Sequence, residues 1–138
     1  MRSARAAIHA FLRADATEKL DAIIINASGC GTTVKDYGRM FAHDPERAGA
    51  ERVASLARDV TEFLDSHGLP PVTQPLDLRV AYHAACSLQH GQRIVAAPKA
   101  LLGQAGATVV TWTCLLVMSG TASMGSLVSW NRPQAETR

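Results

Sequence analysis

Apolar residues along this chain follow two patterns, one typical of helices and one of buried strands. From Arg2 to Leu20 they recur every three or four residues, as in an amphipathic helix. The members of this stripe are Ile8, Phe11, Leu12 and Ala16. Ala22 to Asn26 follows as a β-branched run without polar alternation. This run predicts a strand covered on both faces, as in a parallel sheet.

The clearest helical pattern covers residues 46–67. Its apolar stripe consists of Val53, Leu56, Ala57, Val60, Phe63 and Leu64. Asp44 and Pro45 precede it, a capping residue followed by a proline suited to the first helical position. Gly68 and the prolines at 70 and 71 follow it and stop a helix. One long helix is therefore predicted here.

Shorter segments complete the pattern of elements. Helices are predicted over 32–39, 87–93 and 98–104, and strands over 78–82 and 107–111. Strands that alternate with helices predict an α/β fold, with a mostly parallel sheet and helices packed on it. Residues 1–111 form one predicted domain. Residues 112–138 show no sustained period, and we expect a poorly ordered C-terminal tail.

Two cysteines follow predicted strands in the same way, so the chain contains repeated strand–Cys–helix units. Cys30 lies between Gly29 and Gly31 after the first strand, and Cys86 follows the second. Because parallel strands joined by right-handed crossovers end at one edge of a sheet, we expect both cysteines at that edge.

A thiol at the start of a helix lies beside free backbone N–H groups and a partial positive charge, which favour thiolate. Thiolates bind metals or attack electrophiles, and nearby N–H groups stabilise the sulfurs of iron–sulfur clusters. Glycines such as Gly29 and Gly31 allow the backbone to approach a bound group. Two alternatives stay open: each cysteine is a small buried apolar residue, or one is a hydrolase nucleophile with His83 or His90.

Composition and charge exclude several other classes. The formal net charge of +2 favours neither nucleic acid nor an anionic membrane surface as a partner. The longest apolar run, residues 107–118, contains three threonines and is too short to span a membrane. The N-terminal segment lacks the continuous apolar stretch of a signal peptide. The three cysteines, at positions 30, 86 and 114, are too far apart for a secreted disulfide framework, and we expect a cytoplasmic protein.

Two segments resemble a known family. LDAIIINASGCGTTVKDYG (residues 20–38) and VAYHAACSLQHGQR (residues 80–93) resemble the iron–sulfur subunits of bacterial glycolate oxidases. More broadly, they are similar to the cysteine-rich Cys-Cys-Gly domains shared with heterodisulfide reductase subunits. The resemblance extends from about Arg5 to about Val110.

By this resemblance, Cys30 corresponds to the closing cysteine of one motif copy and Cys86 to the leading cysteine of the next. Ala27 occupies the position of a further cysteine three residues before Cys30. The central Cys-Cys-Gly of the second copy is expected near Cys114, where the chain has one cysteine. The loss of similarity after about Val110 suggests a truncated or frame-changed fragment.

The resemblance implies an electron-transfer role within an oxidoreductase complex, without catalysis by this chain alone. In the family, a flavin-containing subunit oxidises 2-hydroxy acids such as glycolate, and the iron–sulfur subunit relays the electrons through 4Fe-4S clusters. Cys30 and Cys86 would then be metal ligands, with Gly29 and Gly31 beside the cofactor. The implied location is the cytoplasm, peripheral to the inner membrane through the complex. The alternative is a non-redox structural remnant that binds no cluster.

Overall fold

The computed structural model describes residues 2–111. The predicted tail, residues 112–138, lies outside the described residues together with Cys114, and the domain boundary after residue 111 stays a prediction. The elements in chain order are α1 (Arg2–Glu18), β1 (Ile23–Ile25), α2 (Ser28–Lys35), α3 (Tyr37–Met40), α4 (Arg47–Leu56), β2 (Ala57–Asp59), α5 (Val60–His67), β3 (Arg79–Tyr82), the π-helical turn η1 (Ser87–Gly91), α6 (Ala97–Gln104) and β4 (Thr108–Thr111).

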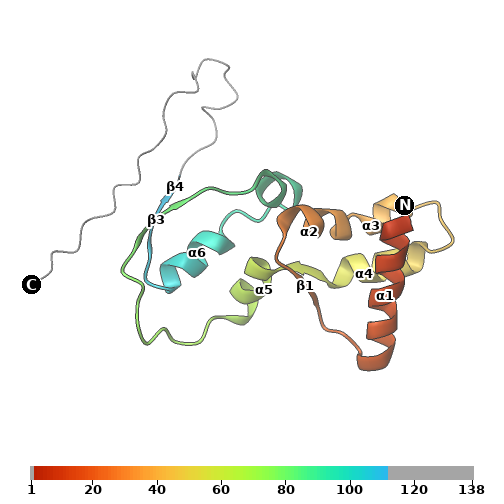
Figure 1. Ribbon diagram of the computed structural model, residues 1–138, viewed down its shortest axis with the longest axis horizontal. Coiled ribbons are helices and arrows are strands. Elements are labelled where there is room, and N and C mark those ends of the chain that lie inside the picture. Colours follow the sequence, from red (N-terminus) through yellow and green to blue (C-terminus); the bar gives the residue numbers. More distant parts are fainter. Residues whose placement is uncertain (1, 112–138) are drawn as a thin grey trace, which may run out of the picture.

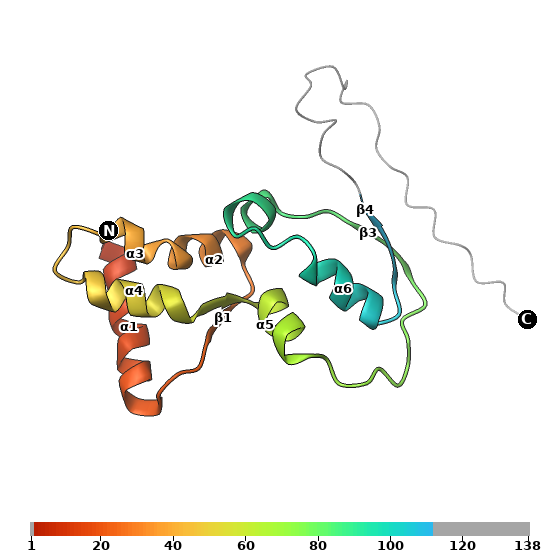
Figure 2. The ribbon, with the colours of Figure 1, turned by 180° about the vertical axis from the view of Figure 1, so that it is seen from behind.

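Two β–α–β units form the fold, which confirms the predicted α/β class with parallel strands. β1 pairs in parallel with β2, with Ile23 opposite Ala57. β3 pairs in parallel with β4, with Arg79 opposite Thr108. The described strands thus lie in two small sheets instead of one. Figures 1 and 2 show an elongated arrangement, with α1 near one end and the β3–β4 pair near the other.

The main hydrophobic core lies in the first unit. Its three fully buried large side chains come from α1, the segment after α3, and α4, and they are Ile8, Phe41 and Val53. Ile23 of β1 and Val34 of α2 pack into the same cluster. Because burial of apolar surface is the dominant stabilising term, this cluster fixes α2 against the first sheet.

The prediction of one helix over residues 46–67 is wrong. Residues 57–59 form β2, which separates α4 from α5. Ala57 and Asp59 are almost fully buried beside β1, so pairing with β1 overrides the local helical pattern. Asp59 also caps α5: its side chain accepts from the backbone N–H of Thr61, and Glu62 accepts from the N–H of Asp59. This capping box starts a new helix inside the predicted one.

Two local predictions also need correction. The sequence predicts that β1 is covered on both faces, but the residue Ile24 is 45% exposed to solvent. Ile23 and Ile25 pack on the core cluster, and a strand directs its successive side chains to opposite faces, so Ile24 points away from it. In addition, α2 begins at Ser28 instead of Thr32, so Cys30 lies inside its first turn.

Candidate functional site

Cys30 is the third residue of α2 and is exposed. The first helical N–H to reach an acceptor is that of Gly31, which donates to the carbonyl of Ala27 at 2.9 Å. The N–H groups of Ser28, Gly29 and Cys30 belong to the first turn, where no intrahelical acceptor exists. The cysteine therefore lies at the positive end of the helix dipole, beside free amide donors, as the sequence predicted.

Cys86 occupies the corresponding place in the second unit. It lies four residues after the end of β3, directly precedes η1 without a side-chain capping bond, and is exposed. The two cysteines are thus solvent-accessible, and neither is the buried apolar residue that was the alternative interpretation.

The two cysteine-bearing segments contact each other directly. The hydroxyl oxygens of Ser28 and Ser87 lie 2.8 Å apart, and the Thr32 hydroxyl donates to the Ser87 carbonyl at 3.1 Å. Gln92, just after η1, donates from Nε2 to the Ser28 carbonyl at 2.9 Å. Ser28 is two residues from Cys30, and Ser87 is next to Cys86, so these bonds bring together the segments that carry both thiols.

Cys30 does not lie on the face of α2 that contacts the Cys86 segment. On α2, Ser28 and Thr32 contact η1, and Gly31 lies against Gln92 just after it. At 100° per residue, Cys30 is turned about 200° from Ser28 around the helix axis. Burial raises the pKa of the Tyr37 phenol, and Cys30 raises it further. Convergence of the two sulfurs stays a prediction.

The charge at the end of β2 affects the phenol at the end of β3. Burial raises the pKa of the Tyr82 phenol, and the negative charge of Asp59 raises it further. Tyr82 ends β3 and Asp59 ends β2. The prediction that Cys30 and Cys86 lie at one edge of a single sheet is nevertheless wrong for the described strands, because β1 and β3 belong to different sheets.

The two predicted cofactor-binding glycines have different surroundings. Gly29 is exposed, and a Cβ atom there would meet nothing within 4 Å. Gly31 is buried, and a Cβ atom there would lie 2.7 Å from Nε2 of Gln92. The space beside Gly31 is therefore used by a side chain of this chain. A role of either glycine toward a cofactor stays a prediction.

Two accessible thiols beside amide donors fit the chemistry of iron–sulfur ligands. A cubane cluster takes four thiolates. Within residues 2–111, no group of three or more His, Cys, Asp or Glu side chains could hold a metal ion, so this part of the chain offers two of the four thiolates. The hydrolase alternative requires a histidine bonded to a thiol. His83 and His90 are exposed, and the hydrolase alternative stays open.

Sequence reasoning missed the residues that join the two segments, which are Ser28, Thr32, Ser87 and Gln92. Their partners are 55 to 64 residues away in the chain. A local pattern carries no signal for such contacts. The one available hint was that the same small and polar residue types accompany both cysteines.

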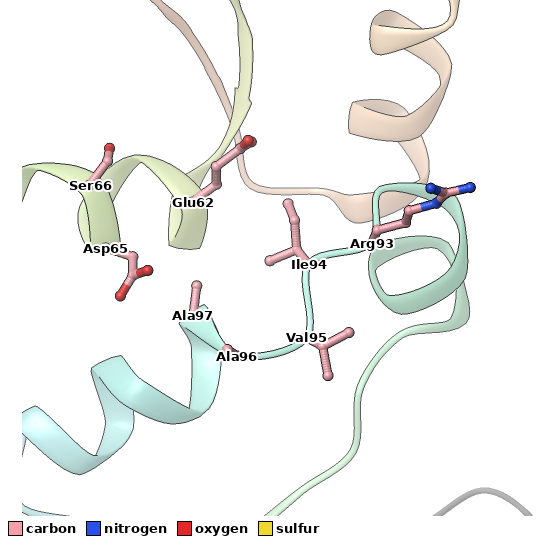
Figure 3. A pocket seen from close by; sticks show the side chains of 8 residues that line it. All are labelled: Glu62, Asp65, Ser66, Arg93, Ile94, Val95, Ala96 and Ala97. Carbon is pink, nitrogen blue, oxygen red and sulfur yellow. The ribbon is translucent and has the colours of Figure 1, made fainter.

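A shallow pocket of about 350 Å³ lies apart from the cysteines, between α5 and the segment before α6. Its walls come from Glu62, Asp65, Ser66 and residues 93–97. Figure 3 shows the guanidinium of Arg93 directed away from Asp65 and Ala97. Glu62 already binds Lys35 and the N–H of Asp59. The pocket therefore offers few free polar groups, and it is not a candidate centre for the thiol chemistry.

Comparison with known proteins first indicates a class. The chain is 33% identical over 84 residues to an uncharacterised iron–sulfur protein of Methanocaldococcus jannaschii, covering 60% of this chain and 14% of that protein. It is 31% identical over 84 residues to another from Methanococcus maripaludis, with the same coverage of each chain. The two relatives are iron–sulfur proteins by name.

A more specific likeness is to the glycolate oxidase iron–sulfur subunit of Escherichia coli K12, at 40% identity over 75 residues. The comparison confirms the resemblance predicted from the sequence. The match covers 54% of this chain and 18% of the relative, so the chain spans less than a fifth of that protein's length. No family model matches the chain, and no solved structure matches it. Among the described residues, no helix combines the length and the apolar character needed to cross a membrane.

Proposed function

We propose that this chain is part of a glycolate-oxidase-type iron–sulfur subunit and supplies Cys30 and Cys86 as two ligands of a 4Fe-4S cluster. The observation that carries the proposal is the direct contact between the segments of the two cysteines, made by Ser28 and Ser87 at 2.8 Å. When bound, such a cluster accepts and releases single electrons. The chain's own contribution is to present two thiols beside free amide groups, including those of Gly29 and Cys30.

The proposed role is electron relay. A flavin-containing partner subunit oxidises a 2-hydroxy acid such as glycolate and passes electrons to the iron–sulfur subunit, which would work in the cytoplasm, peripheral to the inner membrane through the complex. The similarity to the E. coli subunit supports this role. The other two thiolates of the cluster would come from outside residues 2–111, because the described residues offer only two.

A second candidate function rests on the same count of thiols. Since the described part contributes two of four thiolates, the chain can instead be a structural remnant that holds no cluster and contacts partner subunits.

Anaerobic purification and reconstitution with iron and sulfide separate the two candidates. The relay predicts bound iron and visible thiolate-to-iron absorbance, both lost in Cys30→Ser and Cys86→Ser. Cys114→Ser is the matched change at the third cysteine, and iron lost there would add a ligand without contradicting the first two. Colourless, iron-free wild-type protein after reconstitution would contradict the relay and support the structural remnant.

A further inference from the structure

Gln92 connects the end of the Cys86 segment to the start of the Cys30 helix. It directly follows η1, and its Nε2 donates to the carbonyl of Ser28 at 2.9 Å, across 64 residues of chain. Ser28 is the first residue of α2. The bond therefore fixes one amide group against the turn of α2 that contains Cys30.

Two glycines make this contact close. A Cβ atom on Gly31 would lie 2.7 Å from Nε2 of Gln92, and one on Gly91 would lie 2.8 Å from the methyl carbon of Thr32. Real Cβ contacts are not this short. Each segment thus has a glycine at the point where a side chain of the other segment packs against its backbone: Gly31 beside Gln92, and Gly91 beside Thr32. The segments interlock from both sides.

The orientation of Gln92 has a cost. Its Oε1 is buried and has no hydrogen-bond partner among the residues that the structure describes. Unpaired buried polar atoms are uncommon and call for an explanation. If the amide group of Gln92 were flipped, Oε1 would face the Ser28 carbonyl oxygen. Both atoms are acceptors, so the hydrogen bond would be lost. The bond to Ser28 is therefore kept although the other amide atom is left without a donor.

We propose that Gln92 is a positioning residue that holds the Cys86 segment in register with the Cys30 helix, so that both thiols can reach one ligand. The ligand rests on the proposed function, but the positioning does not require metal for its measurement. Ser28 and Thr32 both bond to Ser87, and Gln92 adds a further hydrogen bond from beyond η1 that would restrict rotation of one segment against the other.

The test uses the full chain in a Cys114→Ser background, so that two thiols remain. A short bifunctional thiol reagent is added without metal, and the fraction with Cys30 bridged to Cys86 is measured against single alkylation of each thiol. Gln92→Ala should lower the bridged fraction about three- to tenfold, the shift in population that loss of one hydrogen bond produces. Gln104→Ala, on the exposed end of α6, is the matched control and should bridge like the parent.

A double substitution separates positioning from general damage. Gly31→Ala should displace Gln92 and lower bridging, whereas adding Gly31→Ala to Gln92→Ala should have little further effect, because the clashing amide is gone. If Gln92→Ala does not fold, the isosteric Gln92→Glu replaces it, since it keeps the volume but carries no donor at neutral pH. Circular dichroism and the unfolding midpoint confirm that each variant is folded.

The outcomes distinguish this proposal from the function it rests on. If the wild-type chain takes up no iron while the Cys114→Ser parent bridges readily, the relay is contradicted and the positioning is left intact. Folded Gln92→Ala or Gln92→Glu that bridges like the parent overturns the positioning, whatever the iron content. A parent protein that does not bridge at all also overturns it, because the thiols then cannot reach one small ligand.

Discussion

The Glu62 side chain accepts a hydrogen bond from the backbone N–H of Asp59 at the first turn of α5, at 3.2 Å. The Asp59 side chain accepts from the backbone N–H of Thr61 at 2.9 Å. The same carboxylate oxygen of Glu62 binds Nζ of Lys35 in α2 at 2.6 Å. Glu62 thus links the helix that carries Cys30 to the helix that follows β2, and Asp59 is only 3% exposed.

Replacement of Asp59 tests this junction. Asp59→Ala removes the N-cap acceptor and should lower the free energy of unfolding by about 0.5–2 kcal/mol. The matched control is Asp65→Ala, an exposed aspartate of the same helix, whose effect should stay within about 0.5 kcal/mol. Urea unfolding followed by circular dichroism measures both. Equal effects for the two variants would mean that the cap contributes nothing specific.

The core of the first unit can be tested by a pair of leucines. Leu56 is 6% exposed in the core cluster, whereas Leu78 is 53% exposed before β3. Leu56→Ala should lower the free energy of unfolding by about 2–5 kcal/mol, because it removes buried methyl groups and leaves a cavity. Leu78→Ala removes the same atoms from a site in contact with water and should cost about 0.5 kcal/mol or less. Comparable losses at both positions in urea titrations would contradict the assigned core.

The sequence predicted the elements whose signals are local. The apolar run at Ile23–Ile25 forms the predicted strand, and Cys30 and Cys86 lie at helix starts after β1 and β3. The prediction of one helix over residues 46–67 is wrong because the apolar residues keep a helical spacing through β2, although Ala57–Asp59 pairs with β1. These apolar residues are Val53, Leu56, Val60 and Phe63. The Asp59–Glu62 capping box was a readable sign of a new helix start inside that run.

The division into two sheets and the contact between the cysteine segments could not be predicted in the same way. Sheet membership depends on which distant strands pair, and a single sequence contains no pairing information for Tyr82 or Ile25. Gln92 looks like any polar residue after a turn, and its role is visible only when the carbonyl of Ser28, 64 residues earlier, is beside it.

Two aspartates should make the fold sensitive to acid. Arg52 and the backbone N–H of Leu20 hold the pKa of Asp15 below its ordinary value of 3.8. The N–H of Glu46 and then Arg5 do the same for Asp44. Because each pKa is lower in the folded protein, their stabilisation is complete above about pH 4 and is lost as the pH falls through the folded values.

Carboxyl titration by NMR checks this assignment. Arg52→Gln should raise the pKa of Asp15 toward 3.8 and leave that of Asp36 unchanged. Arg39→Gln is the reciprocal control, since Arg39 is the largest cause of the lowered pKa of Asp36. If either substitution shifts the pKa of both Asp15 and Asp36, then the overall charge of the protein sets these pKa values, and the specific ion pairs do not.

The start of α2 offers a direct test of the thiol count. Ala27 is exposed, precedes Cys30 by three residues and provides no side-chain cap for α2. Ala27→Cys adds a fourth cysteine to the chain, three residues before Cys30, so the variant should retain more iron per chain after reconstitution than the parent. Ala10→Cys, on the exposed side of α1, adds the same thiol elsewhere and is the control. Equal gains in iron would show non-specific binding to added thiols.

Two glycines around the end of α6 should respond to alanine in opposite directions. Gly103 lies within α6, and a Cβ atom there meets nothing within 4 Å. Gly103→Ala should therefore stabilise the protein by about 0.4–1 kcal/mol through the entropy of the unfolded chain. Gly106 has a φ of +88°, and a Cβ atom there would lie 2.6 Å from Cβ of Pro75. Gly106→Ala should cost more than about 1 kcal/mol, because it adds backbone strain to the clash. Thermal unfolding of both variants measures the difference, and a neutral Gly106→Ala would contradict the assigned turn between α6 and β4.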